Sequence, residues 1–220
     1  PLSIAQKVCD EINNLPNRPS IFSIGGDHSV SYPVVKSWLQ AKKKQGKKVA
    51  ILHFDAHTDL MEKRQGIDLC FATWAYQVLQ DLDDPSLMIQ FGIRSSGQPK
   101  EYWESKLGIK QYWADEITNG SIPKIYEEVI EHLEKYNIDE VYVSVDIDAI
   151  DEEYASATGT PEKNGLSPEM PAMILSPILE RFKATGADVV EVAPWIQRIE
   201  DNKIQNTVGA KKTLLTAQAI

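Results

Sequence analysis

The stretch ILHFDAHTD, residues 51–59, begins as an apolar strand and ends in an alternation of carboxylate and imidazole side chains. Asp55, His57 and Asp59 are two residues apart, so on an extended backbone they project to the same side and can converge on a cation. The same pattern, an apolar run followed directly by ligand-type residues, recurs at residues 21–28 and 141–148. The sequence therefore predicts three strand ends that together supply a metal site.

Six side chains of metal-ligand type follow these predicted strands: His28, Asp55, His57, Asp59, Asp146 and Asp148. Taken alone, residues 25–28 also fit a tight turn capped by Asp27 or Ser29, and Asp146 and Asp148 fit a solvated turn. Together they favour one shared site, which has too many carboxylates for a structural zinc. Oxygen ligands mixed with two imidazoles favour manganese, as a pair of ions that share bridging carboxylates.

The composition limits the classes of protein that fit. The chain has 220 residues, of which 42% are hydrophobic and 25% charged, as in a soluble single domain. A formal charge of −9 argues against a nucleic-acid surface, and the basic run at residues 42–48 is read as a solvated helix end. Two cysteines are too few for a disulfide framework. No apolar run approaches the roughly 20 residues of a membrane span and no signal peptide is recognisable, so we expect a cytoplasmic protein that contacts no membrane.

Apolar strand-like runs alternate with longer amphipathic segments, which predicts an α/β fold with a mostly parallel sheet in one domain. Residues 147–167 show no periodicity and predict a long loop, which in a compact domain is usually functional or disordered. In such a sheet, ligands bind beyond the carboxyl ends of the strands, where all three motifs lie. The predicted strands are 21–24, 49–54, 87–92, 109–113, 141–145 and 188–192, and the predicted helices are 3–14, 30–44, 70–80, 121–136 and 168–183.

Three motifs, at residues 25–29, 55–59 and 144–148, resemble in order and spacing the signature motifs of the ureohydrolase superfamily, which includes arginases, agmatinases and formimidoylglutamases. Residues 157–162 resemble the family's loop after the third motif, and residues 189–194 resemble its last sheet strand. The resemblance implies a three-layer arginase-like fold, with helices on both sides of the sheet, and a homo-oligomer. It implies one ureohydrolase domain over residues 1–220 that lacks the family's N-terminal strand region.

The resemblance also implies roles for individual residues. Two Mn²⁺ ions would activate a water for attack on a guanidinium carbon, and Asp148 would accept a proton and pass it to the leaving amine. Glu191 would pair with the substrate guanidinium, for which a planar carboxylate is the matching acceptor, and Thr160 would also bind substrate. One ion would be held by His28, Asp55, Asp59 and Asp146, and the other by Asp55, His57, Asp146 and Asp148.

One position departs from the family pattern. Family members such as arginase and agmatinase carry a proton-relaying histidine after the second motif, and the best match in residues 68–73 is Cys70. A thiol, with a reference pKa of about 8.5, relays protons less readily than imidazole at neutral pH. Cys70 is therefore a candidate catalytic residue or a small buried hydrophobe. His53, inside its strand, is expected to be a buried, hydrogen-bonded residue rather than a ligand.

These features favour a hydrolase that releases urea from a guanidino compound. The glutamate at position 162, after Thr160 in the loop, is similar to the pattern of agmatinases and favours agmatine as substrate. Lys63 and Arg64, just after the second motif, would instead suit a guanidino acid or formimidoylglutamate, unless both are merely solvated. A third hypothesis is a metal-binding homologue with little catalysis and a regulatory or scaffold role, which the substitution at Cys70 keeps open.

Overall fold

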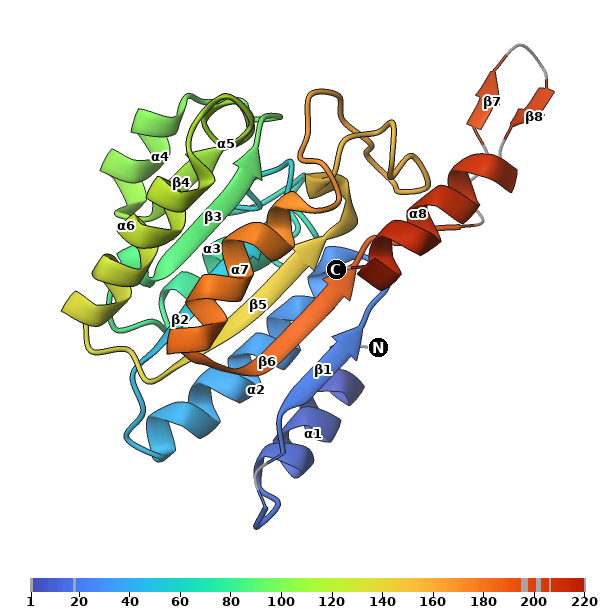
Figure 1. The fold of residues 1–220 in the computed structure, drawn as a ribbon. Helices are drawn as coiled ribbons and strands as arrows, with labels where there is room; N and C mark the ends of the chain where they lie inside the picture. The colour runs from blue at the N-terminus through green and yellow to red at the C-terminus, as the bar shows by residue number, and fades with distance from the viewer. Residues whose placement is uncertain (1, 18, 195–197, 201–202, 206, 220) are drawn as a thin grey trace.

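A six-stranded sheet forms the centre of the computed structural model, which describes the whole chain except residues 1, 18, 195–197, 201–202, 206 and 220. The strand order is β1-β6-β5-β2-β3-β4, and all neighbouring strands run parallel. This confirms the predicted mostly parallel α/β sheet (Figure 1). The strands are β1 (Ile21–Ile24), β2 (Val49–Phe54), β3 (Met88–Ile93), β4 (Lys110–Trp113), β5 (Glu140–Asp146) and β6 (Lys183–Val190).

Helices cover both faces of this sheet and complete the expected three layers (Figure 1). On one face the first two helices pack against each other, and the second contacts the third; on the other face the sixth and seventh pack together. In the described residues no helix has the length and apolar character needed to cross a bilayer. The helices are α1 (Leu2–Asn13), α2 (Ser31–Lys44), α3 (Trp74–Leu79), α4 (Lys100–Leu107), α5 (Ala114–Asn119), α6 (Ile122–Lys135), α7 (Met170–Arg181) and α8 (Thr207–Ala219).

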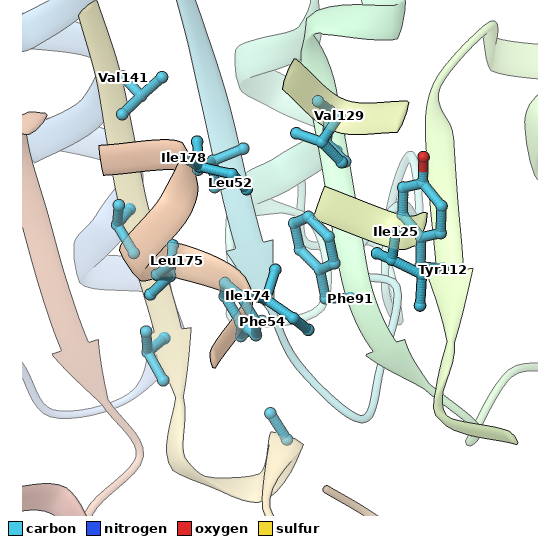
Figure 2. Packing of buried hydrophobic residues seen from close by; sticks show 14 of the residues in the cluster. Leu52, Phe54, Phe91, Tyr112, Ile125, Val129, Val141, Ile174, Leu175 and Ile178 are labelled. Atoms are coloured by element: carbon cyan, nitrogen blue, oxygen red, sulfur yellow. The ribbon is translucent and has the colours of Figure 1, made fainter. Parts of the chain in front are cut away.

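The strand β2 divides its side chains between two hydrophobic cores. Leu52 and Phe54 pack in the core under α6 and α7, part of which is drawn in Figure 2, whereas Val49 and Ile51 face the core under α1 and α2. Every residue of β2 is buried, which explains why its sequence, apart from His53, is an apolar run rather than an alternation with polar residues. Burial of a side chain of this size stabilises the fold by about 1.5–3 kcal/mol.

The sequence located all six sheet strands but misplaced one junction. The predicted helix 168–183 ends earlier, at Arg181, and β6 begins at Lys183 rather than near 188. Pairing with β1 and β5 extends β6 over residues of low strand propensity, so the sheet overrides the local preference. The sequence also did not predict α4, α5, α8 or the antiparallel hairpin of β7 (Arg198–Glu200) and β8 (Lys203–Gln205).

The sheet order brings the three motifs together. The strands β1, β6, β5 and β2 are consecutive neighbours, so their carboxyl ends form one edge. Beside this edge Gly92, in β3, has a positive φ of 91°, and a Cβ there would lie 3.2 Å from the carbonyl oxygen of Asp55. Glycine is therefore needed for β3 to pass this close to the end of β2.

Candidate metal centre

The first cluster of polar side chains surrounds His28, which is buried at the start of a 3-10 turn, residues 28–30, after β1. Its Nδ1 atom lies 3.1 Å from Asp55 Oδ2, 3.2 Å from Asp59 Oδ2 and 3.1 Å from Asp146 Oδ2. One imidazole nitrogen carries at most one proton, so it cannot donate a hydrogen bond to three carboxylates. The Nδ1 atom has no hydrogen-bond partner of acceptable geometry. A divalent cation among these four atoms would satisfy all of them, so the residues fit a metal ion.

A second cluster adjoins the first through Asp55. His57 Nδ1 lies 3.1 Å from Asp148 Oδ2 and 3.4 Å from Asp55 Oδ1. Asp55 thus turns Oδ2 towards the first cluster and Oδ1 towards the second, which is the placement that a bridging carboxylate requires. Asp146 turns Oδ2 towards His28, while its Oδ1 accepts a hydrogen bond from the Asp148 backbone N–H at 2.9 Å. Bridging by Asp146 stays a prediction.

Without a cation, the clusters balance their charge with protons. Burial disfavours the imidazolium form of His28, but the carboxylates of Asp146, Asp55 and Asp59 around Nδ1 stabilise its positive charge and raise its pKa well above 6.5. Burial also disfavours the charged form of His57. The carboxylates of Asp148 and Asp55 outweigh this effect of burial and raise the pKa of His57 to about 11. Burial and repulsion from neighbouring carboxylates raise the pKa of Asp146 well above 3.8. Divalent ions would replace these protons, so metal binding should release protons.

His53 is fully buried and hydrogen-bonded at both ring nitrogens, as predicted. Its Nδ1 accepts from Gln90 Nε2 at 2.9 Å, and its Nε2 donates to Asp55 Oδ2 at 2.9 Å. The orientation of Gln90 is fixed because its Oε1 accepts from Gln111 Nε2 at 2.8 Å while its Nε2 also donates to the Thr58 carbonyl at 2.7 Å. His53 therefore acts on Asp55 and has no free lone pair to offer a cation.

Glu191 and Thr160 lie beside the two clusters. Glu191 follows β6 with a positive φ of 61°, and its Oε1 accepts from the His28 backbone N–H at 2.8 Å. Burial raises the pKa of Glu191 above 4.5. Thr160 Oγ1 donates to Asp148 Oδ2 at 3.0 Å. Asp59 also has a positive φ, 52°, and such strain costs on the order of 1–3 kcal/mol per residue. Two of the five described non-glycine residues with a positive φ, Asp59 and Glu191, therefore lie at the candidate site.

A cavity of about 390 Å³ opens over both clusters. Its volume is that of a small-molecule site. His28, His57 and Glu191 line it together with carboxylates of both clusters. Among the described residues of the lining, Arg64 is the one charged side chain outside the clusters and Glu191, and its guanidinium lies 4.5 Å from the centre of the Phe71 ring. The cavity therefore combines an acidic end with one cationic wall residue.

Comparison with protein-family models gives a match to the arginase family over residues 2–216. The chain belongs to the arginase family. An agmatinase of Bacillus anthracis is 36% identical over 190 residues, which are 86% of this chain and 59% of that protein. A guanidinobutyrase of Pseudomonas aeruginosa is 35% identical over 78% of this chain and 52% of its own length. The chain thus spans between half and three fifths of the length of these curated relatives.

Two solved structures share the fold of this chain. Proclavaminate amidino hydrolase of Streptomyces clavuligerus superposes with a TM-score of 0.76 at 28% identity, over 99% of this chain and 67% of that one. Formimidoylglutamase of Bacillus subtilis gives a TM-score of 0.78 at 21% identity. These likenesses agree with the predicted three-layer arginase-like architecture.

The structure places Phe71, not Cys70, at the cavity of this arginase-family chain. Phe71 lines the cavity, whereas Cys70 is not among the described lining residues. The Cys70 backbone N–H donates to Thr73 Oγ1 at 2.8 Å, and the Cys70 sulfur lies 3.8 Å from the same hydroxyl. A proton-relay role for Cys70 thus gains no support from its position, although it stays a prediction.

Two further residues escaped the sequence analysis. Trp74, at the start of α3, donates from Nε1 to Asp59 Oδ2 at 2.9 Å, and its ring centre lies 4.7 Å from that of His28. Arg94, just after β3, holds the loop that follows the third motif. Its guanidinium donates to the carbonyls of Gly92, Asp148, Ala149, Ile150, Glu162 and Lys163 at 2.7–3.3 Å. No local pattern in the sequence marks these contacts, because Asp59 is 15 residues from Trp74 and five of the six carbonyl partners of Arg94 are 54–69 residues away.

Proposed function

We propose that this protein hydrolyses a small guanidino compound to urea and an amine, with two Mn²⁺ ions as cofactors, in the cytoplasm. The observation that carries the proposal is the convergence of two histidine–carboxylate clusters and Glu191 on one cavity. Membership of the arginase family and the likeness to an agmatinase and a guanidinobutyrase support the same reaction class.

The metal assignment follows from the donor set. Oxygen-rich sites with one imidazole each suit manganese better than zinc, which prefers more nitrogen and sulfur. When bound, the two ions would lower the pKa of a water and stabilise the negative charge that develops in the transition state. The first site would be formed by His28, Asp55, Asp59 and Asp146, and the second by Asp55, His57, Asp146 and Asp148.

The chain's own residues would bind the substrate and move the proton. The buried carboxylate of Glu191 would pair with the guanidinium, and the pairing would compensate the burial that raises its pKa. Asp148 Oδ2 would take the proton that the attacking water loses and deliver it to the leaving amine nitrogen. The Thr160 hydroxyl, 3.0 Å from that oxygen, would hold the carboxylate in place. Water adds oxygen and two protons in total, so the products are urea and a protonated amine.

The position of Arg64 favours a guanidino acid as the substrate, whereas the sequence favoured agmatine. Agmatine carries an ammonium group at the end opposite its guanidinium, and a cationic wall residue would repel it. A carboxylate at that end would be attracted. The Lys63 ammonium is instead engaged with Asp68 at 2.8 Å, and Glu162, the basis of the agmatine hypothesis, contacts His57 at 3.5 Å without lining the cavity. We therefore propose 4-guanidinobutyrate-like acids as the substrate class.

A substrate panel tests the proposal. Urea release is measured with 4-guanidinobutyrate, agmatine, arginine and guanidine, and glutamate release with formimidoylglutamate. We expect the highest kcat/KM for 4-guanidinobutyrate, and Arg64→Glu should reverse the preference towards agmatine. Lys63→Glu is the matched control, because its side chain is outside the cavity lining, and it should leave the preference unchanged.

Two results would contradict parts of the proposal. If wild-type protein turned over agmatine fastest, the role of Arg64 would be wrong while the reaction class stood. If metal-loaded protein released neither urea nor glutamate from any substrate, the regulatory or scaffold hypothesis would replace the enzyme. The observation that favours this hypothesis is Phe71 on the cavity wall, because a phenylalanine side chain cannot relay protons.

A further inference from the structure

A row of polar residues crosses the sheet beneath the candidate metal site. It contains one residue from each of the six strands, and each is the register partner of the next. Polar groups in such a buried row are costly unless hydrogen bonds satisfy them. In sheet order the row is Ser23, Asp188, Ser144, His53, Gln90 and Gln111.

Asp188 is the residue of this row that the proposed reaction leaves unexplained. Its side chain is buried, with 1% of the residue exposed, and no ion pair among the described residues includes it. Each of its two oxygens accepts a hydrogen bond from a hydroxyl group. Ser144 Oγ donates to Oδ1 and the Tyr142 hydroxyl donates to Oδ2, both at 2.7 Å. A buried carboxylate held in this way has no access to substrate, so its effect must pass through a neighbour.

The neighbour that matters is Ser144, which lies between Asp188 and His28. Ser144 Oγ is 3.0 Å from His28 Nε2. A serine hydroxyl has one proton, and Ser144 gives it to Asp188, so towards His28 it can only accept. His28 Nε2 must therefore carry a proton, which in the neutral imidazole leaves the lone pair on Nδ1. That is the atom surrounded by three carboxylate oxygens at 3.1–3.2 Å.

We propose that Asp188 is a positioning residue that, through Ser144, fixes the His28 tautomer in which Nδ1 binds the metal ion. The inference rests on the proposed metal site, though not on the identity of the substrate. Carboxylates that orient metal-binding imidazoles are commonly in direct contact with the ring; here a serine hydroxyl transmits the effect. Removing such an outer partner typically lowers metal affinity by 10- to 100-fold.

The test compares two variants that each change one side of Asp188. Asp188→Asn keeps the shape but introduces an N–H donor, so the Ser144 hydroxyl can turn and donate to His28 Nε2, which would put the proton on Nδ1. Tyr142→Phe removes the other hydroxyl on Asp188 and leaves the Ser144–His28 contact intact. Mn²⁺ affinity is measured by calorimetry with a competing chelator, and thermal unfolding of each metal-free variant shows that it is folded.

We expect Asp188→Asn to weaken the Mn²⁺ site that contains His28 by roughly 10- to 100-fold and Tyr142→Phe to change it by less than about threefold. Wild-type affinity in folded Asp188→Asn would overturn the inference. So would an equal loss in both variants, since the effect would then come from the core rather than from the tautomer. Binding is measured without substrate, so a failure of the proposed urea-releasing reaction would leave this result unaffected. A wild-type chain that bound no Mn²⁺ would overturn both.

Discussion

Arg94→Met should destabilise the protein strongly, although Arg94 lies outside both carboxylate clusters. The guanidinium donates to six backbone carbonyls, two of them from Asp148 and Glu162 at 2.7 and 3.0 Å. Methionine keeps much of the apolar stem and removes every donor. Burial lowers the pKa of the Arg94 guanidinium, so this charge depends on its carbonyl partners for solvation.

The size of the effect follows from the number of carbonyls that lose their charged donor. If only the carbonyls of Asp148 and Glu162 lose their donor, at about 2 kcal/mol for each hydrogen bond to a charged group, the loss is about 4 kcal/mol. For a chain of this length each 1 kcal/mol lowers Tm by roughly 2–4 °C, so we expect a fall of about 10 °C. Gly165 adds to this close packing, because a Cβ there would lie 2.5 Å from Arg94 Nη2.

The assay is thermal unfolding of Mn²⁺-loaded protein followed by circular dichroism. Arg181→Met is the matched control: its side chain is 66% exposed and lies 3.5 Å from Glu134, so its loss should cost less than about 1 kcal/mol. The reasoning would be refuted if the two variants melted within about 2 °C of each other.

Three further outcomes are expected. Glu191→Gln should retain both metal ions by elemental analysis. Its kcat/KM for guanidino substrates should fall by about 10- to 100-fold, because one charge-assisted contact is lost. Undiminished urea release would remove Glu191 from the site. Phe71→His should raise turnover near pH 7 in a pH–rate profile, because residue 71 faces the cavity, whereas Cys70→His should not. If Cys70→His raised turnover and Phe71→His did not, residue 70 would again be the relay position. The metal-free protein should lose stability as pH rises from 6.5 towards 11. Protonated His57 stabilises the fold, and because its pKa is raised to about 11, this contribution is complete below 6.5 and declines up to about 11. A Tm that stayed constant or rose over this range would contradict the assignment.

The sequence by itself determined the sheet, its approximate strands and the six ligand-type side chains. Strands such as 49–54 are buried on both faces, so they appear as apolar runs, and a carboxylate directly after such a run is visible without knowing its neighbours. Parallel strands then place these ends at one edge, which is why His28, Asp55 and Asp146 could be grouped before their distances were known.

The tertiary structure alone decided the residues that support this site. Asp188 and Gln90 lie inside strands whose sequences do not reveal their partners. Only the register between strands shows that Asp188 lies beside Ser144 and Gln90 beside His53. Arg94 likewise binds carbonyls up to 69 positions away. Which of residues 70 and 71 faces the cavity depends on the path of the loop between β2 and α3, which the sequence does not specify. Local patterns record which groups a segment exposes or buries, whereas hydrogen bonds between segments depend on register and loop path, which the packed chain fixes as a whole.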